Sequence, residues 1–381
     1  MRVVYWGTYD TGKPRNRILI KGLRANGTEV IECHKDIWAG IEDKSQVSGW
    51  KKKLGILLRW LSSYPVLIFK YFCLKPHDVV VVGYMGQLDV FMIWPFAKLK
   101  GVPVVWDAFL SLYDTIVYDR KMISNKNPLA FLLFSLEWLA CRACDKIILD
   151  TSAHGKYFID TFQLQDKHVQ TIFVGAEFEV FPSHLKKPKH LEKNSASPFT
   201  ILFYGQFIPL HGIETVVTAA KLTEEKGFQW VLIGKGQETS KIDAVCKKIN
   251  PENLKKIEWV PYEELIKWID KADVGLGIFG NTEKAKRVIP NKVFQMLAAG
   301  CPVITGDTPA ARELLYPSDM ICLVPLDNPA ALAGAVEHMA LTLPKIQQRH
   351  HNKTLINQIL PNHIGYKMAS VLKEVVSKKH H

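Results

Sequence analysis

Four cationic side chains lie within nine residues of one another in the C-terminal half: Lys284, Lys286, Arg287 and Lys292. They follow a continuous apolar run, 273–279, which we expect to be a buried strand. Pro290 stands inside the group, and proline favours the first turn of a helix. Cations beside a helix N-terminus bind phosphate through charge-assisted hydrogen bonds and the helix dipole. The segment predicts a diphosphate site that includes Asn291 and Lys292; the alternative is a solvated basic loop.

A glycine loop earlier in the same half is a second candidate for anion binding. Gly205 ends an apolar run, and Gly212 precedes a helical pattern that starts near Ile213. Exposed N–H groups in such a loop, together with the helix dipole, attract anions. Between the two glycines lie Gln206 and His211, which are therefore candidate donor contacts. The alternative is a plain turn between a strand and a helix.

Polar residues also follow the apolar runs of the N-terminal half: Gly7, Asp10, Arg15, Asn16, Tyr84 and Asp107. We expect Asp10, Arg15, Asn16 and Tyr84 on the acceptor side of a site. Gly7, which has no Cβ, would let a phosphate or an acceptor come close to the backbone. Arg15 is interpreted either as a phosphate contact or as an exposed helix residue.

The elements that must position these residues follow one pattern throughout the chain. Short apolar runs alternate with longer helical patterns in two series: 3–6, 79–83, 102–106, 146–150 and 170–175, then 199–205, 229–234, 257–260, 273–279, 302–306 and 321–325. Continuous apolar strands separated by helices are typical of parallel sheets covered on both faces. The pattern predicts an α/β protein with two doubly wound, Rossmann-like domains that face each other across a cleft. Ligands bind such sheets beyond the carboxyl ends of the strands.

The predicted boundaries follow from composition. Residues 1–180 form the acceptor-binding domain, and residues 199–360 form the donor-binding domain. The segment 181–198 is rich in proline, serine and lysine and has no periodicity, so it is interpreted as a linker. We expect the C-terminal helix 361–379 to pack back on the N-terminal domain.

Length and cysteine content narrow the class of protein. The 381 residues suit two domains, and no apolar run is long enough to span a membrane. Seven cysteines without framework spacing favour a reducing, cytoplasmic location. Cys141 and Cys144 form a C-x-x-C in an apolar helical pattern, where two ordinary helix cysteines are favoured over zinc or redox chemistry.

The net charge of +12 is concentrated in one stretch. Residues 44–75 carry seven basic side chains and no acidic one, interleaved with tryptophan, leucine, tyrosine and phenylalanine. This mixture fits an interfacial helix on anionic lipid, and it fits equally a helix that packs on the core with a basic outer face. No nucleic-acid-binding signature is present, so no nucleic-acid partner is expected.

Several of these segments resemble the family-4 retaining glycosyltransferases of the GT-B fold, group 1 type. The matching pieces of the donor half are ILFYGQFIPLHGIE, VLIGKGQ, ADVGLGIF and VIPNKVFQMLAAGCPVITGDTPAARELL. The opening YWGTYDTGKPRNRILIKGLRANGTEV is similar to the first strand, loop and helix of a bacterial branch. The resemblance implies a nucleoside-diphosphate sugar as donor, with UDP favoured over GDP, and implies no metal or other cofactor.

The chain departs from the family pattern at several positions. The two family glutamates, eight positions apart, are replaced by Arg287 and Gln295. Gln295 can hydrogen-bond a ribose hydroxyl without a charge, whereas Arg287 binds phosphate. The usual arginine and lysine of the diphosphate loop correspond to Gln206 and His211, and a common histidine corresponds to Phe109. The resemblance then implies three catalytic residues: Asp107, Lys284 and Arg287.

The expected activity is transfer of a sugar to a hydroxyl acceptor with retention. The acceptor is expected to be a lipid-linked or cell-surface glycan precursor of polysaccharide biosynthesis, reached at the inner face of the membrane through residues 44–75. Two alternatives stay open. One is an impaired GT-B protein that binds a nucleotide or a partner without turnover, and the other is a nucleotide-sugar epimerase on the same scaffold.

Overall fold

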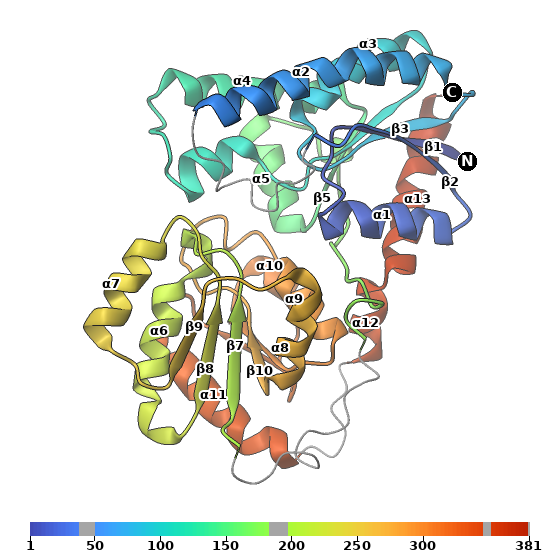
Figure 1. Cartoon of the computed structure of the whole chain (residues 1–381). Helices are drawn as coiled ribbons and strands as arrows, with labels where there is room; N and C mark the ends of the chain where they lie inside the picture. Colours follow the sequence, from blue (N-terminus) through green and yellow to red (C-terminus); the bar gives the residue numbers. More distant parts are fainter. Residues whose placement is uncertain (38–49, 183–196, 346–351, 380–381) are drawn as a thin grey trace. The chain divides into compact units, whose positions relative to one another are not determined.

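The computed structural model of the chain describes residues 1–37, 50–182, 197–345 and 352–379, with only the backbone at 50–53. The chain divides into two units (Figure 1). The first unit comprises Met1–Gly175 and Pro361–His381, and the second comprises Ala176–Leu360. Most of the predicted linker, from 183 to 196, lies outside the described residues.

The first unit is built on a six-stranded parallel sheet in the order β2-β1-β3-β4-β5-β6. Its strands are β1 (Arg2–Gly7), β2 (Glu29–His34), β3 (Val79–Val82), β4 (Val104–Asp107), β5 (Lys146–Leu149) and β6 (Val169–Thr171). The valine runs of β3 and β4 are buried on both faces, as expected for central parallel strands. The strand order reverses between β1 and β3, which is where a doubly wound sheet binds ligands.

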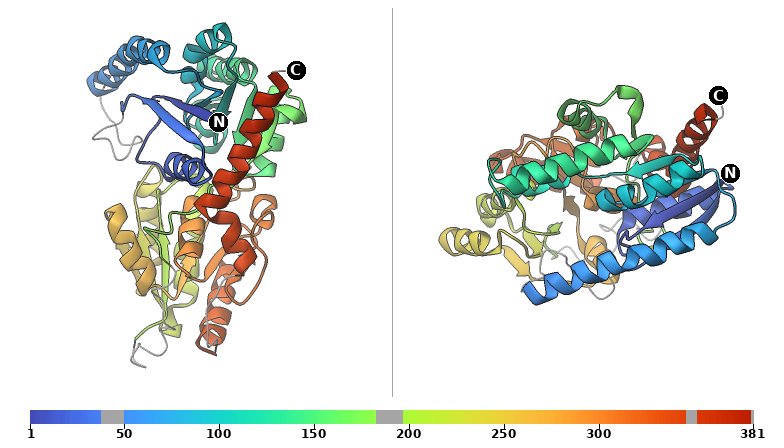
Figure 2. Two further views of the ribbon diagram at one scale, coloured as in Figure 1. Left: turned by 90° about the vertical axis from the view of Figure 1, so that its right-hand side faces the viewer. Right: turned by 90° about the horizontal axis from the view of Figure 1, so that it is seen from above.

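Helices cover both faces of this sheet (Figure 2). One face carries α2 (Trp50–Cys73), α3 (Gln87–Leu99), α4 (Pro128–Ala143) and α5 (Ser152–Phe162). The other face carries α1 (Pro14–Ala25) and α13 (Pro361–Lys379). Side chains of β1 alternate between the two cores: Val4 and Trp6 face the first group of helices, and Val3 and Tyr5 face the second.

The C-terminal helix α13 packs against α1 by backbone contact. A Cβ on Gly22 would lie 2.2 Å from the carbonyl oxygen of Pro361, and a Cβ on Gly365 would lie 1.9 Å from the carbonyl carbon of Gly22. Only glycine at these two positions allows so close an approach. Ile364, Met368 and neighbouring side chains of α13 then complete the core on this face of the sheet.

The second unit repeats the architecture with strand order β12-β11-β10-β7-β8-β9. Its parallel strands are β7 (Thr200–Tyr204), β8 (Gln229–Ile233), β9 (Leu254–Ile257), β10 (Val274–Leu276), β11 (Val303–Gly306) and β12 (Ile321–Val324). Its α-helices are α6 (Ile213–Leu222), α7 (Thr239–Ile249), α8 (Leu265–Lys271), α9 (Asn291–Ala298), α10 (Pro309–Arg312), α11 (Pro329–Thr342) and α12 (Lys353–Ile359). Two doubly wound parallel sheets confirm the predicted fold class.

Candidate functional site

The reversal of strand order in the second unit lies between β7 and β10. The loop after β7 begins with Gly205, whose φ of +143° is a conformation that favours glycine. A Cβ at Gly205 would lie 3.0 Å from Nζ of Lys292 and 3.3 Å from Cε1 of His211. The structure therefore brings together three predicted donor-side residues from two separate segments of the chain, the loop after β7 and the start of α9.

Lys292 is the unusual member of this cluster. The residue is only 5% exposed, and its Nζ lies 3.6 Å from the centre of the Phe203 ring. Among the described residues, this ammonium has no hydrogen-bond partner. Burial lowers the pKa of Lys292 well below the ordinary lysine value. A buried cation without hydrogen bonds costs free energy, and such groups concentrate at functional sites.

His211 makes a hydrogen bond within the loop between Gly205 and Gly212. Its Nδ1 is hydrogen-bonded to the backbone carbonyl of Gln206, which requires the proton to reside on Nδ1. The ring also packs edge-on against Phe203, with centroids 5.6 Å apart. The imidazole therefore holds the loop in shape beside the ammonium of Lys292.

Gly212 starts helix α6 in a conformation that few other residues adopt. Its φ is +63°, and a Cβ there would lie 2.4 Å from the backbone nitrogen of Gly280. No side-chain bond caps the first turn of α6 at Gly212. The second glycine therefore lets the loop pack against the segment after β10 and leaves a helix N-terminus at the same end of the sheet.

The other cations of the 284–292 segment differ in their surroundings. Lys284 is buried and Arg287 is half-buried, so both stay candidates for neutralising a phosphate. Lys286 forms an ion pair with Glu283, at 2.7 Å. Pro290 is the capping residue before α9 rather than a residue of its first turn, so the helix begins at Asn291.

Gln295 belongs to a chain of polar contacts that the sequence did not indicate. Its Oε1 accepts a hydrogen bond from the Tyr204 hydroxyl at 2.9 Å, and its Nε2 donates to the Tyr262 hydroxyl at 3.2 Å. Tyr262 in turn donates to Glu177 at 3.0 Å. Each end of the amide uses one of its two hydrogen-bonding positions on a tyrosine, so Gln295 keeps one donor and one acceptor position for a ribose hydroxyl; that role stays a prediction.

At the equivalent point of the first unit, the expected open space beside Gly7 is filled. A Cβ on Gly7, whose φ is +125°, would lie 2.2 Å from Oδ2 of Asp89. The same carboxylate accepts hydrogen bonds from the Thr8 backbone at 2.7 Å and from the Tyr64 hydroxyl at 2.8 Å. An internal carboxylate therefore occupies the space that a Cβ at position 7 would need, which explains the glycine; its contact with a phosphate or an acceptor stays a prediction.

Asp89 should make the stability of the chain depend on pH. Burial raises its pKa to about 6, above the ordinary aspartate value, so its stabilising contribution is complete below about pH 4 and disappears as the pH rises through 6. We expect the free energy of unfolding to fall by about 2.4 kcal/mol relative to Asp89→Asn between pH 4 and pH 7. Urea unfolding of both proteins across this range measures the difference; parallel curves would contradict the prediction.

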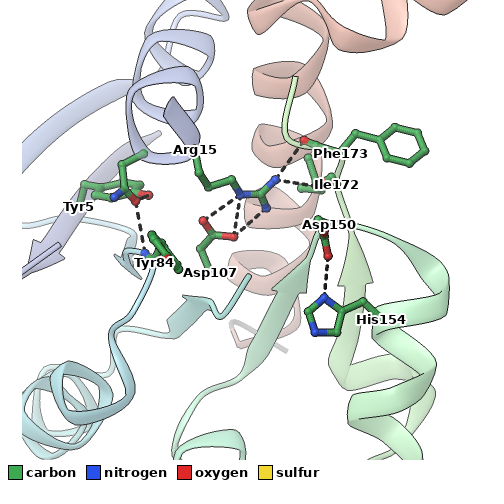
Figure 3. A network of polar contacts seen from close by, with 9 residues as sticks. Tyr5, Arg15, Tyr84, Asp107, Asp150, His154, Ile172 and Phe173 are labelled. Atoms are coloured by element: carbon green, nitrogen blue, oxygen red, sulfur yellow. Dashed lines mark hydrogen bonds and ion pairs between the residues drawn. The ribbon is translucent and has the colours of Figure 1, made fainter. Parts of the chain in front are cut away.

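Arg15 and Asp107 form a buried ion pair (Figure 3). The guanidinium of Arg15 contacts both carboxylate oxygens of Asp107, with a shortest distance of 2.7 Å, and both side chains are almost completely buried. It also donates to the carbonyls of Ile172 and Phe173 at 2.7 and 3.0 Å. Each side chain therefore satisfies the other inside the core, which gives the pair a structural role. The catalytic role of Asp107 and the acceptor-side role of Arg15 stay predictions.

Asn16 is likewise hydrogen-bonded inside the first unit, and its acceptor-side role stays a prediction. It is fully buried, and its Oδ1 accepts hydrogen bonds from the Tyr5 hydroxyl at 3.1 Å and from the Tyr84 backbone at 3.3 Å. Its Nδ2 donates to the backbone oxygen of Asp10 at 2.9 Å. Asp10 and Tyr84 are half-buried at this end of the sheet, so their acceptor-side role stays a prediction.

The sequence and the fold of this chain are similar to those of known glycosyltransferases and related proteins. Residues 198–341 match the family described as Glycosyl transferases group 1. Sucrose-phosphate synthase from Thermosynechococcus elongatus is 15% identical, with a TM-score of 0.70 over 99% of this chain and 100% of that one. HepE of Anabaena, solved with UDP, is 13% identical, with a TM-score of 0.65 over 98% and 99%. The fold is GT-B.

The chain also resembles a curated relative, the chitobiosyldiphosphodolichol beta-mannosyltransferase of Kluyveromyces lactis. The two are 20% identical over 303 residues, which cover 72% of this chain and 67% of the relative. This relative and the family match support a glycosyltransferase. The matched segment contains Gly205, His211 and Lys292, so the buried ammonium lies in the part of the GT-B chain that carries the family signal.

Cys141, Cys144 and the buried His154 are packing residues of the first unit. Cys141 and Cys144 are buried free thiols whose pKa burial raises, so neither is a reactive thiolate. His154 is buried with its Nδ1 2.7 Å from Asp150 (Figure 3). Among the residues described, no group of three or more histidine, cysteine or acidic side chains could hold a metal ion.

Proposed function

We propose that this chain is a glycosyltransferase that moves a sugar from a nucleoside-diphosphate sugar to a hydroxyl acceptor. One observation carries the proposal: the buried ammonium of Lys292 beside Gly205, at the strand-order reversal of the second unit. An ammonium that is buried without a hydrogen bond gains most from a ligand that brings its own negative charge. A diphosphate at the end of β7 is such a ligand.

The proposed chemistry is electrostatic. As the bond between sugar and diphosphate breaks, negative charge grows on the leaving phosphate, and preorganised donors in a dry site stabilise it. Lys292 would supply the nearest positive charge, and the loop held by His211 would supply backbone N–H groups. Lys284 and Arg287 are proposed to neutralise the rest of the charge. On the family resemblance, we propose that transfer needs no metal.

The proposed donor is a UDP-sugar, and the proposed acceptor is a lipid-linked or other glycan precursor of polysaccharide biosynthesis. The solved structure of HepE, which contains UDP, supports the choice of nucleotide. The name of the Kluyveromyces relative includes a diphosphodolichol acceptor, which supports a lipid-linked substrate. The proposed location is the cytoplasmic face of a membrane.

The proposed transfer retains the anomeric configuration of the sugar. Retention rests on the family resemblance alone. The departing diphosphate would then take the proton of the incoming hydroxyl on the same face of the sugar, while the protein positions the reactants. The anomeric configuration of the product, read by NMR, tests this directly: inversion would overturn retention and leave transfer intact.

A donor panel tests the proposal as a whole. Purified protein is incubated with UDP-, GDP- and ADP-sugars, with and without glycan acceptors and with and without EDTA, and the released nucleotide and sugar products are measured. Sugar transfer from UDP-sugars that survives EDTA is the expected result. Nucleotide affinity without sugar release would instead indicate a binding protein, and an isomerised sugar without an acceptor would indicate an epimerase.

A further inference from the structure

Helix α2 of the first unit carries two apolar stripes. Its inner stripe, which includes Tyr64, Leu67 and Tyr71, packs in the core of the sheet. Its outer stripe recurs at helical spacing and is exposed, with Leu58 at 58% and Phe69 at 71%. A helix that is apolar on both sides belongs in a second apolar environment as well as in the core.

The neighbouring helices α3 and α4 extend the exposed apolar surface. Phe72 of α2 contacts Phe96 of α3, with ring centroids 5.4 Å apart, and α3 joins α4 through a hydrogen bond from Gln87 to Glu137 of 3.0 Å. All three helices pack on the same face of the sheet, so their outer sides point away from it together (Figure 2). Their exposed large apolar side chains are Leu54, Leu57, Leu58, Leu61, Val66, Phe69, Phe72, Trp94, Leu99, Leu129, Phe131, Leu132 and Leu139. We call this surface the α2–α4 face.

The surface of the second unit provides an internal comparison. Its described exposed large apolar side chains are Leu222, Trp259, Tyr316 and Leu341, which are spread over separate elements. Scattered apolar residues are normal on a protein surface, whereas a contiguous set marks an interaction site. The α2–α4 face is therefore a distinct feature of the first unit.

Exposed charge within the three helices of the α2–α4 face has a single sign. The acidic side chains within the helices are Asp89 and Glu137, and both are buried and hydrogen-bonded internally. The exposed charged side chains described within the helices are all basic: Arg59, Lys70, Lys98 and Arg142. At the helix ends lie the exposed Lys75, Lys100 and Lys126, and one exposed acidic residue, Asp145, whose carboxylate accepts a hydrogen bond from the Val104 backbone. A binding partner of this face must therefore present both an apolar surface and negative charge.

We propose that the α2–α4 face docks on the surface of an anionic lipid bilayer. Among the described residues, no helix has the length and hydrophobicity needed to cross a membrane. The leucine and phenylalanine side chains would enter the boundary between headgroups and acyl chains, and the surrounding lysines and arginines would contact the phosphates. A second copy of this chain is a poor occupant, because a twofold interface would place two basic faces against each other.

Vesicle sedimentation tests the proposal without any need for catalytic activity. Wild-type protein should sediment with vesicles of phosphatidylcholine and phosphatidylglycerol at low salt, and it should stay in the supernatant with phosphatidylcholine alone or at high salt. Lys70→Gln/Lys98→Gln should bind anionic vesicles about 30-fold more weakly, since each basic residue near the surface contributes about 1 kcal/mol. Lys247→Gln/Lys248→Gln, which removes the same charge from exposed positions of α7, should bind like the wild type.

An apolar variant tests insertion separately from charge. Leu58→Gln/Leu61→Gln/Phe69→Gln should abolish sedimentation, whereas Leu222→Gln/Tyr316→Gln/Leu341→Gln should leave it unchanged. Because all six side chains are exposed, thermal melts should match the wild type and exclude misfolding as the cause. Equal sedimentation of the two triple variants would overturn the proposal.

Fluorescence quenching locates the contact. Brominated acyl chains should quench part of the tryptophan emission, and Trp94→Phe should remove part of that quenching while Trp259→Phe should not. Wild-type protein that stays in the supernatant with anionic vesicles at low salt would overturn the proposal. So does a protein that sediments as a dimer in the ultracentrifuge and becomes monomeric in the apolar triple variant, because the face would then join two copies of the chain.

Discussion

Lys292→Met should weaken UDP binding and at the same time stabilise the ligand-free protein. The loss of a charged hydrogen bond to the diphosphate costs about 1.5–3 kcal/mol, or roughly 10- to 150-fold in affinity. The gain arises because methionine keeps the apolar stem near Phe203 and removes a buried ammonium without hydrogen bonds. A residue that serves packing alone would not produce opposite effects on binding and stability.

Calorimetry and thermal melts measure the two effects. Lys286→Met is the matched control, because Lys286 is paired with Glu283 outside the cluster, and it should change neither quantity. Loss of stability in Lys292→Met with unchanged UDP affinity would show that the ammonium is structural and would remove the main support for the proposed function.

Lys292→Met should also change the number of protons that the protein takes up when it binds UDP. Burial lowers the pKa of Lys292 in the free protein, and a bound diphosphate would raise it again by favouring the charged form. UDP binding by the wild type should therefore take up protons above the lowered pKa, and affinity should decline as the pH rises. Titrations in buffers of different ionisation enthalpy measure the uptake, which Lys292→Met should abolish.

The sequence was most informative where a feature is local. The central strands are continuous apolar runs, so their number and their parallel arrangement could be predicted. The edge strands were harder, because water on one side admits charged residues. Strand β2, which carries Glu29 and Glu32, corresponds to none of the predicted runs. Strand β9, which includes Lys255 and Lys256, begins three residues before the predicted run 257–260.

The distance along the chain between two residues also decides whether their contact can be predicted from the sequence. Gly205 and His211 lie in one loop, and their proximity follows from short spacing and from the meeting of strand ends. Arg15 and Asp107 are 92 residues apart, and each alone is typical of a polar group at a strand end. Only the fold shows that the two meet in the core, which converts two candidate site residues into one ion pair.

Asp107→Asn should therefore cost stability rather than chemistry alone. The substitution leaves the Arg15 guanidinium buried beside a neutral group, and breaking a buried ion pair by removing one partner costs about 3–5 kcal/mol. Urea unfolding measures this loss. Glu29→Gln, which breaks the pair with Arg2 at the surface of the same unit, is the control and should leave unfolding nearly unchanged.

A double variant distinguishes the structural role from the catalytic one that the sequence suggested. Arg15→Met/Asp107→Leu removes both charges, so it should be more stable than Asp107→Asn, although the carbonyls of Ile172 and Phe173 lose their donor. If the pair is structural, the double variant should transfer sugar at a temperature where it is folded. A folded double variant without transfer, beside an Asp107→Asn protein of wild-type stability, would restore Asp107 to the reaction, because a group needed only for packing leaves chemistry intact once the core is repacked.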